Sequence, residues 1–380
     1  MQFKPFCLDR CFHLNQIIMN KFYAKLLFTF LAIAIVSCDK SNNSLDVPIY
    51  DDSPYLLNLG SLPPPPLPED NPLTKEGVKL GKMLFHDTRL SKNGEQACAS
   101  CHLQTDGFSD IRQFSIGVEG EEGGRQAMAI FNMAYHKNGF FWDGRAPLLR
   151  DQSLLPIQDP LEMNETLENV VSKLEADPEY VDQFFRAFGS EEINSLKMSL
   201  AMEQFMNTII SNNAKWDKVL EGEASFTESE ERGRELFFTE FNPGTQTGGA
   251  ECFHCHGGFN FTNDAFMNNG LDTEAEMTDE GYANVTKDDA DKGKFKVPSL
   301  RNIEFTPPYM HDGRFATLEE VLDHYDHGVK DSPSLDILMQ FNLNPGLQMS
   351  SQDKKDLIAF MKTLSDESLK TNTEYQSPFN

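Results

Sequence analysis

Two short strings of residues constrain this chain more than any other feature of its sequence. They read Cys98-Ala99-Ser100-Cys101-His102 and Cys252-Phe253-His254-Cys255-His256, so both have the form Cys-x-x-Cys-His. This pattern attaches a c-type haem. Two thiols one helical turn apart add to the two vinyl groups of one porphyrin, and the histidine ligates the iron. The sequence therefore predicts two covalent haems, held by Cys98, Cys101 and His102 and by Cys252, Cys255 and His256.

Zinc binding and dithiol redox chemistry are the alternatives for a Cys-x-x-Cys string. Both fit this chain less well, because each string continues into a histidine. No further cysteine pair is present to complete a four-cysteine zinc site.

The other three cysteines, Cys7, Cys11 and Cys38, lie near the N-terminus. Lys21 and Lys25 precede an apolar stretch, residues 26–36, that is short for a membrane span. It ends in Ile35-Val36-Ser37-Cys38, which resembles a bacterial lipobox. We expect residues 1–37 to be a lipoprotein signal peptide, starting at Met1 or Met19, and Cys38 to carry the lipid. An uncleaved N-terminal anchor is the alternative. Either reading predicts a cell-envelope or periplasmic protein.

Residues 38–69 are first acidic and then rich in proline, with Pro63 to Pro66 in one run. Proline at this density favours a stiff, extended segment, so we interpret the range as a linker between lipid and folded domain. The formal net charge of −26 argues against nucleic acid or anionic lipid as a partner. The membrane is therefore expected to be reached only through the N-terminal lipid.

Helical patterns dominate the rest of the chain, and strand patterns are scarce, so we predict a mainly α fold with long loops. Two Thr-x-x-Glu capping boxes are expected to open helices. The expected helices begin at Thr74, Thr227 and Thr317 or cover residues 167–188, 193–210 and 351–364. The predicted domains are an N-terminal haem domain over 70–225, a C-terminal haem domain over 226–366, and a tail over 367–380.

Three further strings, in order with the two haem strings, resemble the bacterial dihaem cytochrome c peroxidase/MauG family over roughly residues 70–366. They are Phe141-Trp142-Asp143-Gly144-Arg145-Ala146, Phe295-Lys296-Val297-Pro298-Ser299-Leu300-Arg301-Asn302 and Pro308-Tyr309-Met310-His311-Asp312-Gly313. The resemblance implies two cytochrome c-like haem domains with a calcium ion between them. It also implies a peroxidatic N-terminal haem and a C-terminal haem that receives electrons.

The resemblance places the catalytic residues at fixed offsets from the tryptophan string. Glu162 falls at the position of the acid/base and Gln152 at that of the residue that orients peroxide and water. Trp142 falls at the position of the relay between the haems. A peroxide site needs a group that moves a proton between the two oxygens, which a carboxylate can do. Without the resemblance, Glu162 and Gln152 are ordinary loop residues, with Asp151, Asp159 and Glu165 equally available.

Two positions depart from the peroxidase pattern towards that of MauG. Many members carry an iron-binding histidine in the loop after the first haem string, and here that position is Val118. We therefore expect the first iron to be open at rest. The methionine that ligates the second iron in classical members is replaced by Tyr325, which shares a helical face with Leu318 and Leu322. His324 is the alternative ligand. A phenolate stabilises ferric iron and lowers its potential relative to methionine.

The calcium ligands implied by the resemblance are a side-chain amide at Gln126 and the backbone carbonyls of Thr306 and Pro308. The family has asparagine at the first of these positions. His311 is expected to contact the haem surroundings rather than to ligate iron.

Three functions are open. The first is a peroxidase that reduces hydrogen peroxide with electrons from a donor cytochrome or cupredoxin. The second is a MauG-like oxidase that uses a peroxide-derived, high-valent dihaem to oxidise a protein or a small molecule. The third is a dihaem electron carrier without catalytic activity, which requires both irons to be six-coordinate. A homodimer is a further expectation.

Overall fold

The computed structural model of this protein describes residues 47–245 and 247–379, and Pro48–Asn380 form one compact unit. The predicted signal peptide, residues 1–37, lies outside the described residues. So do the predicted lipidation site, Cys38, and the first part of the linker. Within the described ranges, no helix is long and apolar enough to cross a membrane.

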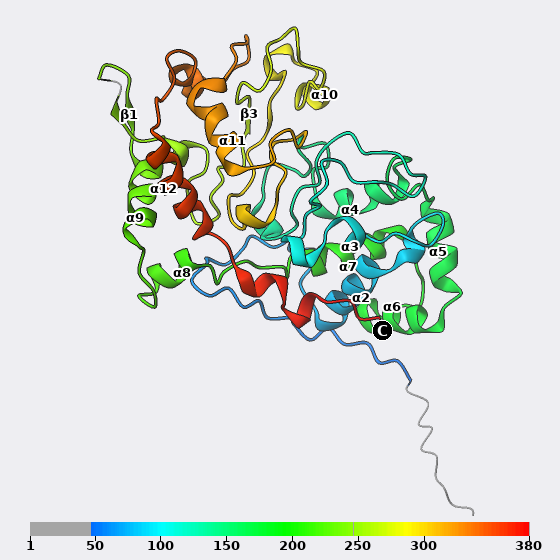
Figure 1. The fold of residues 1–380 in the computed structure, drawn as a ribbon. Helices are drawn as coiled ribbons and strands as arrows, with labels where there is room; N and C mark the ends of the chain where they lie inside the picture. Colours follow the sequence, from blue (N-terminus) through cyan, green and yellow to red (C-terminus); the bar gives the residue numbers. More distant parts are fainter. Residues whose placement is uncertain (1–46, 246, 380) are drawn as a thin grey trace, which may run out of the picture. The chain divides into compact units, whose positions relative to one another are not determined.

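The fold is mainly α, as predicted, and long loops join its helices (Figure 1). The helices are α2 Lys75–His86, α3 Cys98–Cys101, α4 Leu149–Gln158, α5 Leu167–Glu175, α6 Pro178–Phe188, α7 Ser195–Met206, α8 Lys215–Leu220, α9 Glu228–Phe238, α10 Ala283–Thr286, α11 Leu318–Asp323 and α12 Ser351–Lys362. Two short antiparallel ladders pair β1 Phe241–Asn242 with β2 Thr247–Gly248, and β3 Phe266–Met267 with β4 Phe295–Lys296.

The helix starts follow the capping residues of the sequence. The side chain of Thr74 accepts a hydrogen bond from Gly77 N, and Thr227 and Thr317 form the predicted capping boxes with Glu230 and Glu320. The prediction of one helix over 167–188 was wrong, because the chain forms α5 and α6 instead. The second helix begins at Pro178, which suits a first helical position, and Asp177 caps it.

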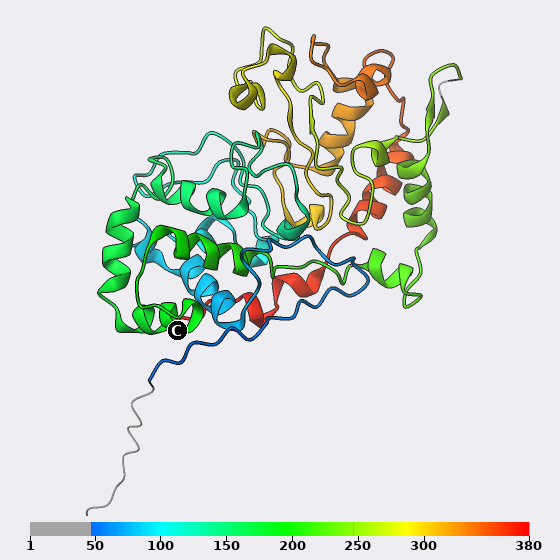
Figure 2. The same cartoon turned by 180° about the vertical axis from the view of Figure 1, so that it is seen from behind.

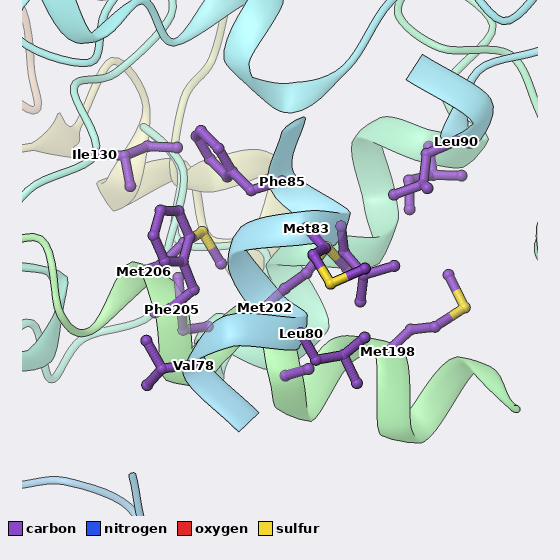
Figure 3. Packing of buried hydrophobic residues seen from close by; sticks show 14 of the residues in the cluster. Val78, Leu80, Met83, Phe85, Leu90, Ile130, Met198, Met202, Phe205 and Met206 are labelled. Carbon is purple, nitrogen blue, oxygen red and sulfur yellow. The ribbon is translucent and has the colours of Figure 1, made fainter. Parts of the chain in front are cut away.

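The first hydrophobic core is built where α2 crosses α7. Figure 3 shows Leu80 and Met83 on α2 beside Met198 and Met202 on α7. The backbones approach closely at Gly81, where an added Cβ would lie 1.9 Å from Ala201 O. Only glycine permits this approach, so Gly81 fixes the crossing that supports the first haem string.

The second core repeats this arrangement with α9 and α12 (Figures 1 and 2). A Cβ on Gly233 of α9 would lie 1.9 Å from Asp356 O on α12. Helix α8 also belongs here, since Trp216 contacts this core and Asp217 pairs with the buried Arg301 at 2.8 Å. The chain therefore reaches the second core before residue 225.

Both ends of the described chain pack on the first core. Leu369 and Tyr375, from the predicted tail, are buried in it, and Tyr375 Oη donates to Thr208 O at 2.9 Å. In the predicted linker, Leu62 is buried and Pro63 O accepts a hydrogen bond from Tyr135 Oη at 2.7 Å. From Asp51 onward the predicted linker lies on the folded body, where Asp51 N donates to Arg186 O at 3.0 Å.

Candidate functional site

Two cavities lie within the compact unit, and each is lined by one Cys-x-x-Cys-His string. The first cavity, of about 540 Å³, is lined by Cys98, Cys101 and His102. The second, of about 240 Å³, is lined by Cys252, Cys255 and His256. All four cysteines are free thiols. Each cavity thus offers an apolar space, two thiols and an imidazole, which is the donor set that a c-type haem requires.

The two histidines are oriented by backbone carbonyls. His102 Nδ1 lies 3.1 Å from Phe108 O, and His256 Nδ1 lies 3.1 Å from Pro298 O and 3.3 Å from Phe261 O. These contacts fix Nδ1 as the donor and leave Nε2 as the nitrogen for iron. Burial lowers the pKa of His102, and it lowers the pKa of His256 to about 4. Both rings are therefore neutral at neutral pH, as a metal ligand must be.

Gln152 and Glu162 both line the first cavity, so the structure brings together the two residues that the sequence singled out. Gln152 lies on α4, and Glu162 follows it in a turn in which Glu162 N donates to Asp159 O. Among the described residues, neither side chain has a hydrogen-bond partner. Burial and the nearby Asp159 raise the pKa of Glu162 to about 7, which Arg145 partly opposes. A carboxyl group with this pKa can both accept and donate a proton near neutral pH.

The loop that carries Val118 forms one wall of the first cavity through Ser115, Ile116 and Gly117. Val118 itself does not line the cavity. Its N–H donates to Glu162 O at 2.8 Å and holds the loop against that turn. The close packing requires Gly117, whose added Cβ would lie 2.2 Å from Leu161 O. Among its described residues, the loop therefore presents Ser115, Ile116 and Gly117 to the cavity, none of which has an imidazole.

Trp142 lines both cavities and is almost fully buried. Its Nε1–H donates to Gln126 O at 2.8 Å, and its own carbonyl accepts from Lys296 N at 2.7 Å. The indole is thus fixed in the wall that the two cavities share, which is where a relay between two haems has to lie.

Tyr325 lines the second cavity, and His324 does not. The helix α11 ends at Asp323 and continues into a π-helical turn, His324–Gly328, so Tyr325 does not follow the α-helical spacing assumed from the sequence. The widened turn is a feature often found at functional sites. His324 Nε2 instead donates to Asn269 O at 3.0 Å. Burial raises the pKa of Tyr325 to about 12, so its phenol ionises at neutral pH only on binding a cation.

Gln126, Thr306 and Pro308 all line the second cavity. The amide nitrogen of Gln126 donates to Ser109 Oγ and Asp110 O, both at 3.1 Å. That leaves the amide oxygen, which is the atom suited to calcium. His311 lies in the same cavity, stacked on Phe295 with ring centres 3.6 Å apart.

Three titratable residues in or beside the shared wall carried no assignment from the sequence. His136 and Lys296 line both cavities. Both pair with Asp264, His136 at 2.6 Å and Lys296 at 2.8 Å. His136 and Lys296 lie near or within the family strings and could have been singled out there. Asp264 is 128 residues from His136, and no local pattern marks it.

Comparison with known proteins finds similarity to dihaem cytochrome c peroxidases and to MauG. The model of the di-haem cytochrome c peroxidase family matches residues 75–225. The methylamine utilization protein MauG of Methylorubrum extorquens is 39% identical over 306 residues, which is 80% of this chain and 82% of that protein. Cytochrome c551 peroxidase of Nitrosomonas europaea is 33% identical over 302 residues, 79% of this chain and 83% of its own. The crystal structure of a MauG-like protein associated with microbial copper homeostasis has a TM-score of 0.77 at 35% identity, covering 86% of this chain and 99% of that one.

Proposed function

Because the chain belongs to the dihaem cytochrome c peroxidase/MauG family, it is an oxidoreductase that acts on peroxide and carries two c-type haems. We propose that hydrogen peroxide is reduced at the first cavity with electrons that arrive through the second. One observation carries this proposal: Glu162 and Gln152 line the cavity of the first haem string, and Trp142 connects that cavity to the second.

The roles of the residues follow from their chemistry. The haem supplies the iron that binds and reduces peroxide, while the protein positions the reactants and moves protons. With haem held by the first string, Glu162 would accept a proton from one oxygen of peroxide and return it to the other, which would then leave as water. Gln152 offers both an amide donor and a carbonyl acceptor, and so orients peroxide and the departing water. Tyr325 is the ligand that we assign to the second iron, and Trp142 is the relay.

A MauG-like oxidase is the second candidate. Tyr325 in the second cavity favours it, because a phenolate lowers the iron potential and makes the second haem a poor acceptor from a high-potential cytochrome. The loop over residues 115–119 favours it as well. It contains no histidine, and Val118 stands at the position of the iron-binding histidine of many members. The protein or small molecule that is oxidised then replaces the donor cytochrome or cupredoxin as partner.

Further proposals concern location and assembly. We place the protein in the cell envelope, held by a lipid on Cys38, with a homodimer as its assembly. We also propose that one calcium ion is bound by Gln126 Oε1 and the carbonyls of Thr306 and Pro308. All three residues lie on the second cavity, near the wall that contains Trp142.

Stopped-flow mixing of the fully ferric protein with hydrogen peroxide tests the open first site. We expect reaction without prior reduction, because the other histidine of this cavity, His136, is held by Asp264. Multiple turnovers with a reduced cytochrome or cupredoxin would support the peroxidase. Turnover only with an oxidisable protein or small molecule would support the MauG-like oxidase. A ferric protein that stays inert until it is half-reduced, or a carrier with two low-spin irons, would contradict the open site.

The pH profile of peroxide consumption should report the ionisation of Glu162. Its carboxylate form accepts the first proton, so the rate should rise with pH and reach half its maximum near the carboxyl pKa of about 7. Below that pH the group is protonated and cannot act as a base. Steady-state rates measured from pH 5 to pH 9 check this, and a profile that is flat through neutral pH would contradict it.

A further inference from the structure

One amide side chain contacts the proposed ligand of the second iron and has no role in the function described so far. Asn269 Nδ2 donates to Tyr325 Oη at 3.2 Å and to Met310 Sδ at 3.5 Å, and all three residues line the second cavity. We propose that Asn269 is a positioning residue that holds Tyr325 for iron and sets the potential of the second haem. The inference rests on the proposed function, in which Tyr325 is the ligand.

The position of Asn269 is fixed from several sides. Its carbonyl accepts from His324 Nε2, the neighbour of Tyr325 on the π-helical turn. Its preceding residue, Asn268, donates to Ser332 Oγ and Ser334 Oγ and accepts from Gly270 N. Asn269 also lies two residues after the end of β3, which is paired with β4. The amide therefore meets Tyr325 from a segment that is bonded to three others, so its direction is set before any metal binds.

The direction of this hydrogen bond suits a phenolate. An amide nitrogen can only donate, so the oxygen of Tyr325 is the acceptor. Among the described residues, no acceptor is present for the proton of the Tyr325 hydroxyl. On binding ferric iron, Tyr325 would release that proton to solvent, and its phenolate oxygen would keep the bond from Asn269. Ligation therefore costs no hydrogen bond within the protein, and a bond to a charged oxygen is stronger than one to a neutral phenol.

The same bond has an electronic consequence. A donated hydrogen bond withdraws electron density from the phenolate, which weakens its donation to iron and raises the reduction potential relative to a bare phenolate. The position of Asn269 also gives His324 a function, because His324 bonds to the backbone carbonyl of Asn269. Although it is buried beside Tyr325, it acts on the ligand indirectly, by holding the backbone of Asn269.

The test compares variants of the full-length holoprotein by redox titration and by resonance Raman spectroscopy of the iron–phenolate stretch. Asn269→Leu keeps the approximate size but removes the donor. It should lower the equilibrium constant for reduction of the second haem about tenfold, the effect of one hydrogen bond to a charged group, and raise the stretching frequency. Asn269→Asp keeps the shape, places an acceptor against the phenolate and should lower the constant further. The first haem should be unchanged in both.

Met310→Leu is the matched control, because it removes the other acceptor of the same amide and leaves the bond to Tyr325. It should leave the potential unchanged. An unchanged potential and stretch in both Asn269 variants would overturn the inference, and so would an equal fall in Met310→Leu. Tyr325→Phe distinguishes failure of this inference from failure of the proposed function. If that variant leaves the spectrum of the second haem unaltered, Tyr325 is not the ligand and the proposed function fails at that point.

Discussion

Glu162→Gln should slow the consumption of hydrogen peroxide by roughly two to four decades, the usual contribution of a positioned acid/base. Glutamine keeps the size and hydrogen-bonding capacity of the side chain but cannot carry the proton between the two oxygens. Because no described residue bonds to the Glu162 side chain, the substitution breaks no contact, and the spectra of both haems should stay nearly native. Stopped-flow measurement of the first peroxide-dependent spectral change gives the rate.

Asp159→Asn is the matched control, since Asp159 lines the same cavity and was one of the alternatives in the sequence. It should cost far less activity and lower the pKa of Glu162, because Asp159 helps to raise it. Equal losses in the two variants would contradict the assignment.

Glu162→Gln should also remove a pH-dependent destabilisation of the folded protein. A carboxyl whose pKa is raised by folding destabilises the protein increasingly from about pH 4.5 up to its folded pKa of about 7.

Replacing both cysteines of one haem string should reduce the covalent haem content from two per chain to one. In Cys98→Ala with Cys101→Ala, peroxide reduction should be lost, because the cavity with Glu162 then holds no attached haem. In Cys252→Ala with Cys255→Ala, the first cavity should keep its haem and peroxide binding, while turnover with a donor should fail. Pyridine haemochrome assays and mass spectrometry of the denatured chain give the stoichiometry.

The control for this experiment is the native chain, which should carry two covalent haems. An unchanged haem content in either double variant would refute the prediction that each string attaches one haem. Folding is the other readout, since each string lies against its own hydrophobic core and the porphyrin fills the cavity beside it. We therefore expect each double variant to unfold at a lower temperature than the native protein.

Local patterns in the sequence predicted structural features, such as helix starts, that depend on residues close together in the chain. The caps at Thr74, Thr227 and Thr317 set the starts of their helices, because a threonine oxygen meets the free backbone N–H groups of the first turn wherever the helix packs. Glu162 and Gln152, which line one cavity, were predicted only through the family resemblance, from their offsets to the tryptophan string, and no local pattern marks them. The break between α5 and α6 was also readable, since Pro178 follows Asp177, but apolar periodicity across it suggested one helix.

Contacts between distant segments could not be predicted, because they leave no periodic trace. Gly81 and Gly233 look alike in the sequence as helical glycines, and only the structure shows that each meets the backbone of a helix more than a hundred residues away. The bond from Asp264 to His136 is of the same kind. Tyr325 was predicted from regular α-helical spacing, but the chain there forms a π-helical turn, and this is the backbone from which Tyr325 reaches the second cavity.

The burial of Leu369 and Tyr375 in the first core affects the order in which this protein can be made. A ribosome synthesises the chain from its N-terminus, so α2 and α7 are complete long before Tyr375 exists. Until then Thr208 O lacks the hydroxyl that donates to it, and Phe108 lacks the ring that packs against it. The first core therefore closes only after the residues of the second have been made. The first half of the chain therefore cannot complete its own core without residues from the C-terminal end.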